Sequence, residues 1–411
     1  MKGTQVVTIK SFSPMFKDGE EAANIHIVNV EEHGFDIVAQ KSLYSIGDKV
    51  LYIQPDFCLS NISLFESFIA PESNPNKSRL GKNNRIKAVK FGFTNNKGNK
   101  VYSNGILLPL DKVFEFIKSI DNNEKILQYS NTNYYSEIDF DFALGITKYE
   151  EPEKGKVGNT KGDLPNGMYK TDETNFKNNF KQLEKLLPCQ LIGSIKIDGS
   201  SNSIYFKSQT NYGICSRLLE KYLTEKSYVG YKKYYHKDSK IMGWLLKSDN
   251  TTFISDDDMK LFEENNKVEV IETIAQDDFV ELGYPILEKL KQYNKPLTVR
   301  SEIFGNSLKG SGNKNNPHAK LPKSITVYGI DDYSTNVCIP LPMIEVINIC
   351  KELELPMVDI IFNKVFNTID EIENECEEYF KSNLIEGIVI RTYEINGYSG
   401  KYMNNEYDSR K

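Results

Sequence analysis

The sequence predicts an α+β protein in which a small closed β-barrel precedes a larger region of strands and helices. Short β-rich runs separated by turn residues fill the first part of the chain, and strand-like and helix-like segments alternate in the rest. A segment rich in Gly, Pro and Lys at residues 147–167 lies between the two parts and indicates an exposed connection. We therefore expect domains over residues 1–145 and 146–411, each long enough to bury a core.

The barrel is predicted from Thr4 to about Leu110. Its runs are rich in β-branched and aromatic residues, and Gly47-Asp48 introduces one of them. Five or six such strands are typical of a small closed barrel. The runs are TQVVTIK, ANIHIVNV, FDIVAQ, KVLYIQ, RIKAVKFGF and GILLPL.

A helical period follows from Asp111 to about Leu127, and further elements are expected beyond the connection. Helices are predicted over 175–187, within 256–293, over 342–352 and over 369–381. The last of these opens with a capping-box pattern from Thr368 to Glu371. Strands are predicted at LIGSIKI, SNSIYF, YGICS, LTVRSEIF, SITVYGI, GIVIRTY and YSGKYM.

Composition excludes several classes of protein. The formal net charge of -6 argues against a uniformly basic nucleic-acid coat, although it does not describe how charge is distributed. No run approaches the roughly 18 apolar residues of a membrane helix, and the N-terminus lacks a signal-peptide core, so we expect a soluble intracellular protein of cytoplasm or nucleus. The six cysteines and four histidines show no metal-type spacing, which favours reduced thiols over a zinc site.

One segment is locally basic. Between Glu72 and Asp111 there is no acidic residue, and Phe91, Phe93 and Tyr102 are interleaved with the cations. Such a segment is either a solvated charge run or a surface that follows a phosphate backbone and stacks on bases. The cations are Lys77, Arg79, Lys82, Arg85, Lys87, Lys90, Lys97 and Lys100.

The strongest local motif is Lys196-Ile197-Asp198-Gly199-Ser200, at the end of an apolar run. On an extended segment, residues two apart point to the same side, so an amine and a carboxylate lie together. Such an amine can attack phosphorus, but the short pattern also occurs by chance. No P-loop and no GxGxxG motif offers another nucleotide site.

Further residues downstream of this motif make it more specific. With them the sequence resembles the covalent nucleotidyltransferase superfamily of RNA ligases, DNA ligases and capping enzymes, whose motifs occur in this order. The resemblance implies a transferase domain of antiparallel sheets with flanking helices, similar to ATP-grasp ligases. The residues are Arg217 in GICSR, Glu302 in LTVRSEIFG, Tyr328 in ITVYGI, Glu386-Gly387 and Arg391 in LIEGIVIRT, and Lys401 in YSGKYM.

The resemblance is closer to the fifth RNA ligase family, in which an OB-like module precedes the transferase domain. It covers most of the chain and includes GDKVLYIQPDFCLS, VYSNGILLPL, LGITKYEEP and the KTDET run at 170–174. It implies an ATP-dependent RNA ligase that seals 3'-OH and 5'-phosphate ends, with nicked duplex RNA or an RNA/DNA hybrid as partner and a monomer as the expected state. In related DNA ligases and capping enzymes the OB module follows the catalytic domain, so the domain order discriminates among them.

The resemblance also implies a role for each motif residue. Lys196 corresponds to the nucleophile that accepts AMP, and Lys401 to a lysine that stabilises charge on the α-phosphate. The others are implied to bind nucleotide or metal: Arg217, which contacts the nucleotide; Tyr328, which stacks on adenine; and Asp198, Glu302 and Glu386, which organise the metal. Core packing is the alternative for Tyr328, a structural acid for Glu302, and either a structural or an RNA-contacting role for Arg391.

Elementary electrostatics predicts the metal independently. Asp198, Glu302 and Glu386 around Lys196 would stabilise the ammonium and raise its pKa, which disables it as a nucleophile. A divalent cation reverses the local sign, and oxygen-only ligands suit Mg²⁺ or Mn²⁺. The resemblance implies that the carboxylates hold this ion largely through its waters.

Two departures from the family are apparent. Asn175 stands where an arginine is expected after KTDET, so either a neighbour such as Lys177 or Lys181 replaces that charge or a later step is weakened. The chain is also expanded between Leu218 and Pro296, where lysines and tyrosines at 219–250 suit either RNA contact or helical packing. A GTP-dependent capping enzyme and a non-catalytic RNA-binding protein with a decayed transferase domain remain the alternatives.

Overall fold

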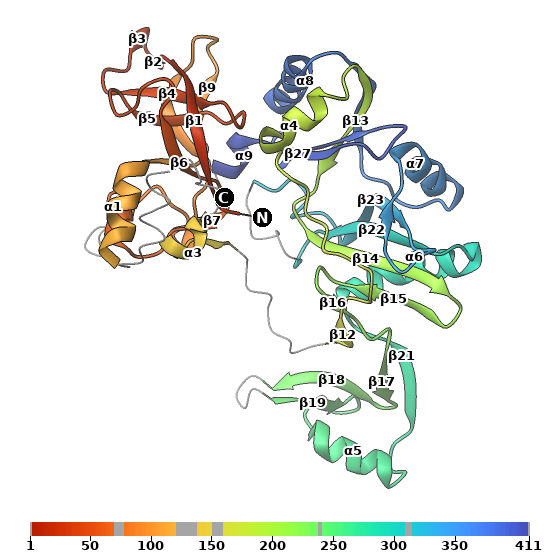
Figure 1. The fold of residues 1–411 in the computed structure, drawn as a ribbon. Coiled ribbons are helices and arrows are strands. Elements are labelled where there is room, and N and C mark those ends of the chain that lie inside the picture. The colour runs from red at the N-terminus through yellow and green to blue at the C-terminus, as the bar shows by residue number, and fades with distance from the viewer. Residues whose placement is uncertain are drawn as a thin grey trace.

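The structure is a computed structural model that describes residues 2–69, 78–120, 138–149, 159–236, 241–308 and 315–409. The chain is an α+β protein whose named strand pairs are all antiparallel within these residues. The N-terminal part, coloured red to orange in Figure 1, forms one body, and the sheets and helices that follow residue 162 form a larger one. The predicted class is confirmed, whereas the predicted boundary at residue 145 stays a prediction.

The N-terminal part is a barrel-like arrangement built on one long strand. That strand, β1 (Thr4–Ser13), pairs with β6 on one side and with β4 on the other, and its register shifts between Ile9 and Ser11. A five-stranded and a four-stranded sheet result. The five-stranded sheet has the order β10 (Ile106–Pro109), β6 (Lys49–Ile53), β1, β4 (Ile25–Val30) and β5 (Ile37–Gln40). The four-stranded sheet has the order β3 (Glu20–Glu21), β2 (Phe16–Lys17), β8 (Val89–Thr94) and β9 (Lys100–Ser103).

Three apolar clusters hold this part together, of which the smallest contains Met15, Ala22, Ile27 and Val101. Val7, Val28 and Tyr52 belong to a buried cluster between the strands. A second cluster lies between β6 and β10 and the two helices α1 (Leu110–Ile120) and α3 (Phe140–Leu144). Helix α1 is the one predicted from Asp111, and its expected continuation over 121–127 lies outside the described residues.

The larger body contains two sheets with helices on their outer faces. Helices α6 (Asp278–Tyr293) and α7 (Met343–Glu352) pack on the larger sheet, and α4 (Phe176–Glu184) and α8 (Ile369–Ser382) pack on the smaller. All four agree with the predicted helices. The strand order of the larger sheet is β12 (Gly162–Asp163), β16 (Leu219–Glu220), β15 (Asn211–Cys215), β14 (Ser200–Ser208), β22 (Leu297–Phe304), β23 (Ser324–Asp332) and β24 (Ile339–Pro340). The strand order of the smaller sheet is β25 (Ile360–Phe366), β13 (Cys189–Lys196), β26 (Gly387–Thr392) and β27 (Ser399–Met403).

The expansion between Leu218 and Pro296 forms a small β-rich unit at the bottom of Figure 1. Tyr228, Trp244 and Met259 form its buried core. Tyr228 and Tyr231 do pack in this core, but from strands, so the packing alternative holds and only the predicted helix is wrong. Tyr222 lies outside the strands, and Lys237 and Lys240 lie outside the described residues. Its elements are β17 (Thr224–Tyr228), β18 (Tyr231–His236), β19 (Ile241–Leu246), β20 (Phe253–Ser255), α5 (Asp256–Glu264) and β21 (Val270–Ile274).

Several contacts join the barrel to the larger body. The Gly34 N–H donates to the Lys177 carbonyl at 2.8 Å, and the Asn178 side chain donates to Gln54 at 3.0 Å. Strand β11 (Thr147–Lys148), beyond the predicted boundary, pairs with β7 (Phe57–Cys58) of the barrel. The C-terminal helix α9 (Asn405–Ser409) lies between the two bodies (Figure 1).

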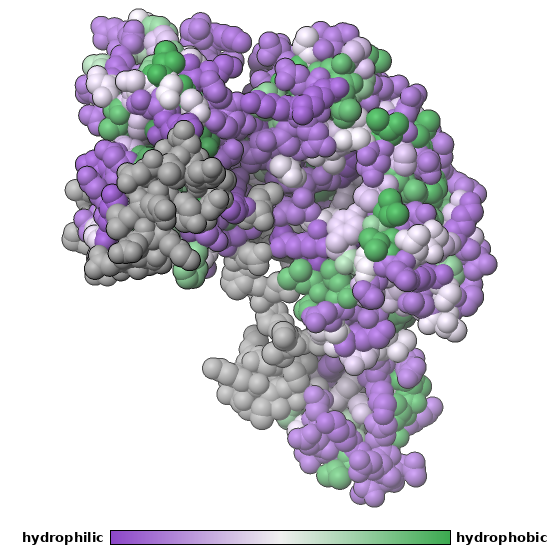
Figure 2. Space-filling model, viewed as in Figure 1, coloured by the Kyte–Doolittle hydropathy of each residue, from purple (hydrophilic) through white to green (hydrophobic). Residues whose placement is uncertain are grey.

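The surface in Figure 2 is predominantly hydrophilic, with small and separate hydrophobic patches. None of the helices in the described ranges is both long enough and apolar enough to span a membrane.

Candidate active site

A cavity of about 1020 Å³ lies where the two sheets of the larger body face each other and the barrel closes one side. Strands β13, β14, β22, β23, β26 and β27 all contribute to its walls. All residues predicted for the site line this one cavity: Lys196, Asp198, Arg217, Glu302, Tyr328, Glu386 and Lys401.

Lys196 is placed by close backbone packing at the end of β13. Its Cα is opposite Gly387 on β26, and a side chain at Gly387 would meet the Tyr402 carbonyl at 2.6 Å. A Cβ at Gly199 would lie 2.4 Å from the Ile303 carbonyl. Glycine is required at both positions because neighbouring backbone leaves no room, and the close approach brings Glu302 and Glu386 to Lys196.

The carboxylates of the cavity favour the ammonium form of Lys196. Its Nζ donates to Glu386 Oε2 at 2.6 Å. Burial lowers the pKa of Lys196, but Glu386, then Glu302 and Asp198, raise it by more, so the pKa lies above its ordinary value. The direction agrees with the electrostatic argument from the sequence: Lys196 is not nucleophilic until the carboxylates find another cation.

The three acids come from separate elements. Asp198 follows β13, Glu302 lies on β22, and Glu386 immediately precedes β26. Within the described part of the chain, no three His, Cys, Asp or Glu side chains are placed to hold a metal ion directly. Carboxylate oxygens that surround one amine nevertheless fit a hydrated Mg²⁺ or Mn²⁺, which binds proteins through few direct ligands.

A second charge cluster centres on Asp172, which the sequence analysis did not select. Its carboxylate lies 2.7 Å from Lys148 Nζ, 3.5 Å from Lys401 Nζ and 3.7 Å from an Arg217 nitrogen. Burial raises the pKa of Asp172, but Lys148, Lys401 and Arg217 lower it by more. Three cations around one carboxylate make an anion site, and the KTDET run was the available sequence signal.

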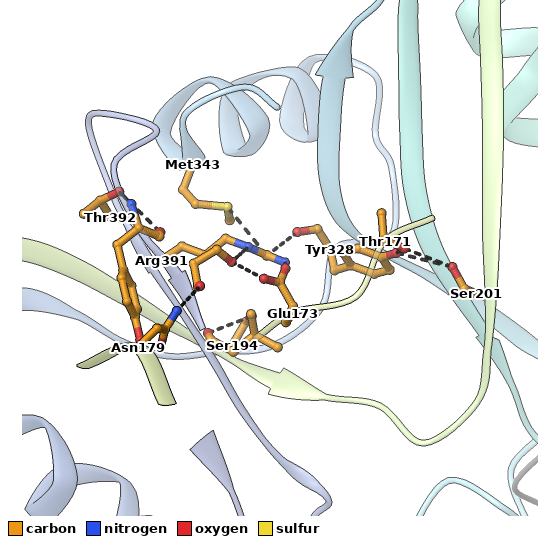
Figure 3. A network of polar contacts seen from close by, with 12 residues as sticks. Thr171, Glu173, Asn179, Ser194, Ser201, Tyr328, Met343, Arg391 and Thr392 are labelled. Atoms are coloured by element: carbon orange, nitrogen blue, oxygen red, sulfur yellow. Dashed lines mark hydrogen bonds and ion pairs between the residues drawn. The ribbon is translucent and has the colours of Figure 1, made fainter. Parts of the chain in front are cut away.

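A polar network fixes Tyr328 and the segment that carries Asp172 (Figure 3). The Tyr328 hydroxyl lies 2.9 Å from Thr171 Oγ1, and Arg391 donates to the Tyr328 carbonyl at 2.7 Å. Arg391 also forms an ion pair with Glu173, which accepts from Ser399. The contacts of Arg391 support its structural interpretation, although Arg391 borders the cavity, as the half-buried Tyr328 does.

Asn175 has a local structural role. Its side chain accepts from the Lys177 N–H at 3.0 Å and caps α4. Lys177 Nζ lies 3.9 Å from Glu373 and over the Tyr402 ring, and neither Lys177 nor Lys181 lines the cavity. Of the two alternatives for the missing arginine, replacement by Lys177 or Lys181 therefore finds no support in this cavity, and a weakened later step stays a prediction. Lys148, from the LGITKYEEP stretch, is one of the lysines that line the cavity, together with Lys170 and Lys221.

The basic segment of the barrel is partly used within the molecule. Lys90 and Lys100 form ion pairs with Glu406, and Phe91 and Phe93 pack against a buried cluster. Arg85 pairs with Asp56 at the cavity wall. Lys77, also assigned to this segment, lies outside the described residues. These contacts reduce the surface available for stacking on bases.

Comparison with solved structures places the fold among RNA ligases. Naegleria gruberi RNA ligase variants with AMP and Mn (18% identity, TM-score 0.64) and with ATP and Mn (19%, 0.63) each match over 99% of this chain and 98% of theirs. The same ligase with PPi matches over the same shares at 19% identity and a TM-score of 0.64. The sequence matches no family profile and no curated protein sequence. The fold is therefore shared over nearly the whole chain.

Proposed function

We propose that this protein is an ATP-dependent RNA ligase that joins 3'-OH and 5'-phosphate ends through a lysyl-AMP intermediate. The observation that carries the proposal is that one cavity holds Lys196 among three carboxylates and, beside them, three cations around Asp172. The shared fold with a ligase bound to ATP, AMP or PPi supports it.

In the first step Lys196 attacks the α-phosphorus of ATP. The ammonium first loses one proton to solvent to give the neutral amine. A bond then forms from Nζ to phosphorus, the bond to the pyrophosphate oxygen breaks and pyrophosphate leaves, and Nζ loses a second proton to solvent. Asp198, Glu302 and Glu386 would hold Mg²⁺ or Mn²⁺, which supplies positive charge that favours the neutral amine and offsets charge on the α-phosphate. Tyr328, held by Thr171, offers the adenine ring a surface for stacking.

The cation cluster orients the phosphates. Lys401, Arg217 and Lys148 converge on Asp172, so phosphate oxygens would replace that carboxylate as their partner. Positioning and charge stabilisation supply most of the catalysis in phosphoryl transfer. We assign to Lys148 the fixed charge that Asn175 does not provide.

Two further transfers complete ligation. AMP passes from Lys196 to the RNA 5'-phosphate, and the 3'-OH then attacks that phosphate and releases AMP. Since both ends must be held together, we propose a nicked RNA duplex or RNA/DNA hybrid as substrate, bound to this single chain. Backbone contacts from the barrel should make sealing strongly salt-dependent.

The proposal is tested by incubating the protein with Mn²⁺ and labelled ATP or GTP and measuring an acid-resistant nucleotide adduct. We expect an adduct with ATP that is absent in Lys196→Ala and retained in Lys364→Ala. Lys364 is the control because it lies on β25, next to the strand of Lys196, and pairs with Glu375. An ATP adduct in Lys196→Ala would overturn the assignment of the nucleophile. Labelling by GTP alone would indicate a capping enzyme, and no adduct a binding protein.

A further inference from the structure

Helix α9 is a single short helix between the barrel and the cavity (Figure 1). Five residues are too few for a helix to be stable alone, so its position depends on its contacts. Consecutive residues Glu406, Tyr407 and Asp408 contact different bodies of the protein.

The inner contact of α9 reaches the nucleophile motif. The Tyr407 side chain is fully buried, and its hydroxyl donates to Asp198 Oδ2 at 2.7 Å. The base of the helix is anchored beside another acid, because the Asn404 N–H donates to the Glu386 carbonyl at 3.0 Å. The Asn404 side chain in turn accepts from the N–H groups of Glu406 and Tyr407. Two of the three acids around Lys196 therefore contact this end of the chain.

The outer contact of α9 reaches the barrel. The Glu406 carboxylate accepts from Lys90 Nζ at 3.1 Å and Lys100 Nζ at 3.2 Å, and also from the Tyr102 hydroxyl. The Asp408 carboxylate accepts from the Ala88 N–H at 3.3 Å. Since the Glu406 side chain is only 18% exposed, these contacts fix α9 against β8 and β9.

We propose that Tyr407 is a positioning residue that orients Asp198, and that α9 makes lysine adenylylation depend on the docked barrel. The inference rests on the proposed function. The hydroxyl holds one carboxylate oxygen of Asp198, so the side chain keeps one orientation toward the cavity. When Glu406 and Asp408 lose the barrel, the short helix loses its outer support and Tyr407 no longer holds Asp198 in place.

The test compares Tyr407→Phe with Tyr402→Phe. Both changes remove one buried hydroxyl that donates to a carboxylate, but Tyr402 donates to Glu377 at 2.9 Å, away from the cavity. Loss of an outer hydrogen bond to a metal-organising residue typically costs about 10- to 100-fold. We expect that loss in the single-turnover rate of adenylylation for Tyr407→Phe, with the apparent affinity for ATP within about twofold. An unchanged rate would overturn the positioning role.

The coupling to the barrel is tested with Glu406→Gln and with the pair Lys90→Ala and Lys100→Ala, against Lys381→Ala, which removes a lysine paired with the surface residue Glu378. Adenylylation needs no RNA, so any role of these lysines in RNA binding does not enter. We expect both barrel changes to slow adenylylation and the control to have no effect. If Tyr407→Phe fails to fold, these variants still decide the proposal, and full activity in both would overturn it.

Hydrogen exchange supplies a readout that does not depend on ligase activity. We expect the backbone amides of residues 197–200 to exchange faster in Tyr407→Phe and Glu406→Gln than in the unaltered protein, without nucleotide. Tyr402→Phe should leave that exchange unchanged. Unchanged exchange in both test variants would refute the coupling. If the unaltered protein forms no adduct, the proposed function fails, while this measurement still decides whether α9 holds the Asp198 segment.

Discussion

Substituting Lys148 with alanine should lower the single-turnover efficiency of adduct formation with ATP by about tenfold. Lys148 Nζ lies 2.7 Å from Asp172, beside Lys401 and Arg217, and its side chain is 32% exposed. A hydrogen bond to a charged group contributes about 1.5 to 3 kcal/mol, and the partial exposure of Lys148 favours the lower value. Because about 1.4 kcal/mol corresponds to a factor of ten, a tenfold loss follows.

Part of that loss is offset before ATP binds. In the free protein Lys148 already pairs with Asp172, so its contribution to binding is the difference between a phosphate and a carboxylate partner. The dianionic character of the terminal phosphate makes the difference favourable to ATP. We therefore expect the effect of Lys148→Ala to be larger in an Asp172→Asn background, where the competing partner has lost its charge.

The assay is single-turnover formation of the enzyme adduct over a range of ATP concentrations. The matched control is Lys161→Ala, since Lys161 forms a 2.8 Å pair with Glu220 but does not line the cavity. Equal rates and equal ATP dependence for Lys148→Ala and the unaltered protein would refute the assignment of Lys148 as a phosphate ligand.

Three further changes test other parts of the site. In the Lys148→Ala background, Asn175→Arg should restore adduct formation, although loss of the α4 cap costs about 1 kcal/mol of stability; no recovery would contradict the charge replacement. Asp331→Asn should lower the free energy of unfolding in urea by about 3 to 5 kcal/mol, because it removes the charged partner of the buried Arg300. The control Glu378→Gln, at an exposed ion pair, should change that free energy by under about 0.5 kcal/mol. Burial raises the pKa of Glu173, but Arg391 and Ser399 bring it below the usual 4.5. The ionised Glu173 therefore stabilises the fold above that pH, and this contribution is lost as the pH falls further. Between pH 6 and pH 3 the urea midpoint should fall less in Glu173→Gln than in the unaltered protein, and parallel curves would contradict this.

The sequence predicted those features that depend on local pattern or on a long ordered motif. Helix α8 begins after Thr368 as the capping pattern indicated. The seven predicted site residues, of which Lys196 is the first and Lys401 the last in the sequence, line one cavity. The role of Asp172 could not be predicted, since it depends on cations from three separate segments meeting at one carboxylate. Lys177 follows KTDET closely, yet the turn into α4 directs it toward Glu373.

The Gly-, Pro- and Lys-rich segment that begins near residue 147 predicts that the barrel is a separate module. Its basic residues illustrate why that view is incomplete. Lys90 and Lys100 have the composition expected of an RNA surface, but they hold Glu406, which is more than 300 positions away in sequence. No local pattern distinguishes a lysine that faces phosphate from one that faces a distant carboxylate. Only the folded arrangement shows that the chain end beside Asp198 also rests on the barrel.

The charged groups of the cavity pair with one another. Lys196 pairs with Glu386, and the cations that we assign to phosphate pair with Asp172. Both pairings oppose chemistry, since the first keeps the amine protonated and the second occupies the anion site. On the proposed function, ATP and a divalent ion would give each group a new partner: Asp198, Glu302 and Glu386 would hold the ion, and the three cations would bind phosphate. Because the ion alone would already offset the carboxylates, metal without nucleotide should make Lys196 more reactive toward amine reagents, whereas adduct formation should require metal and ATP together.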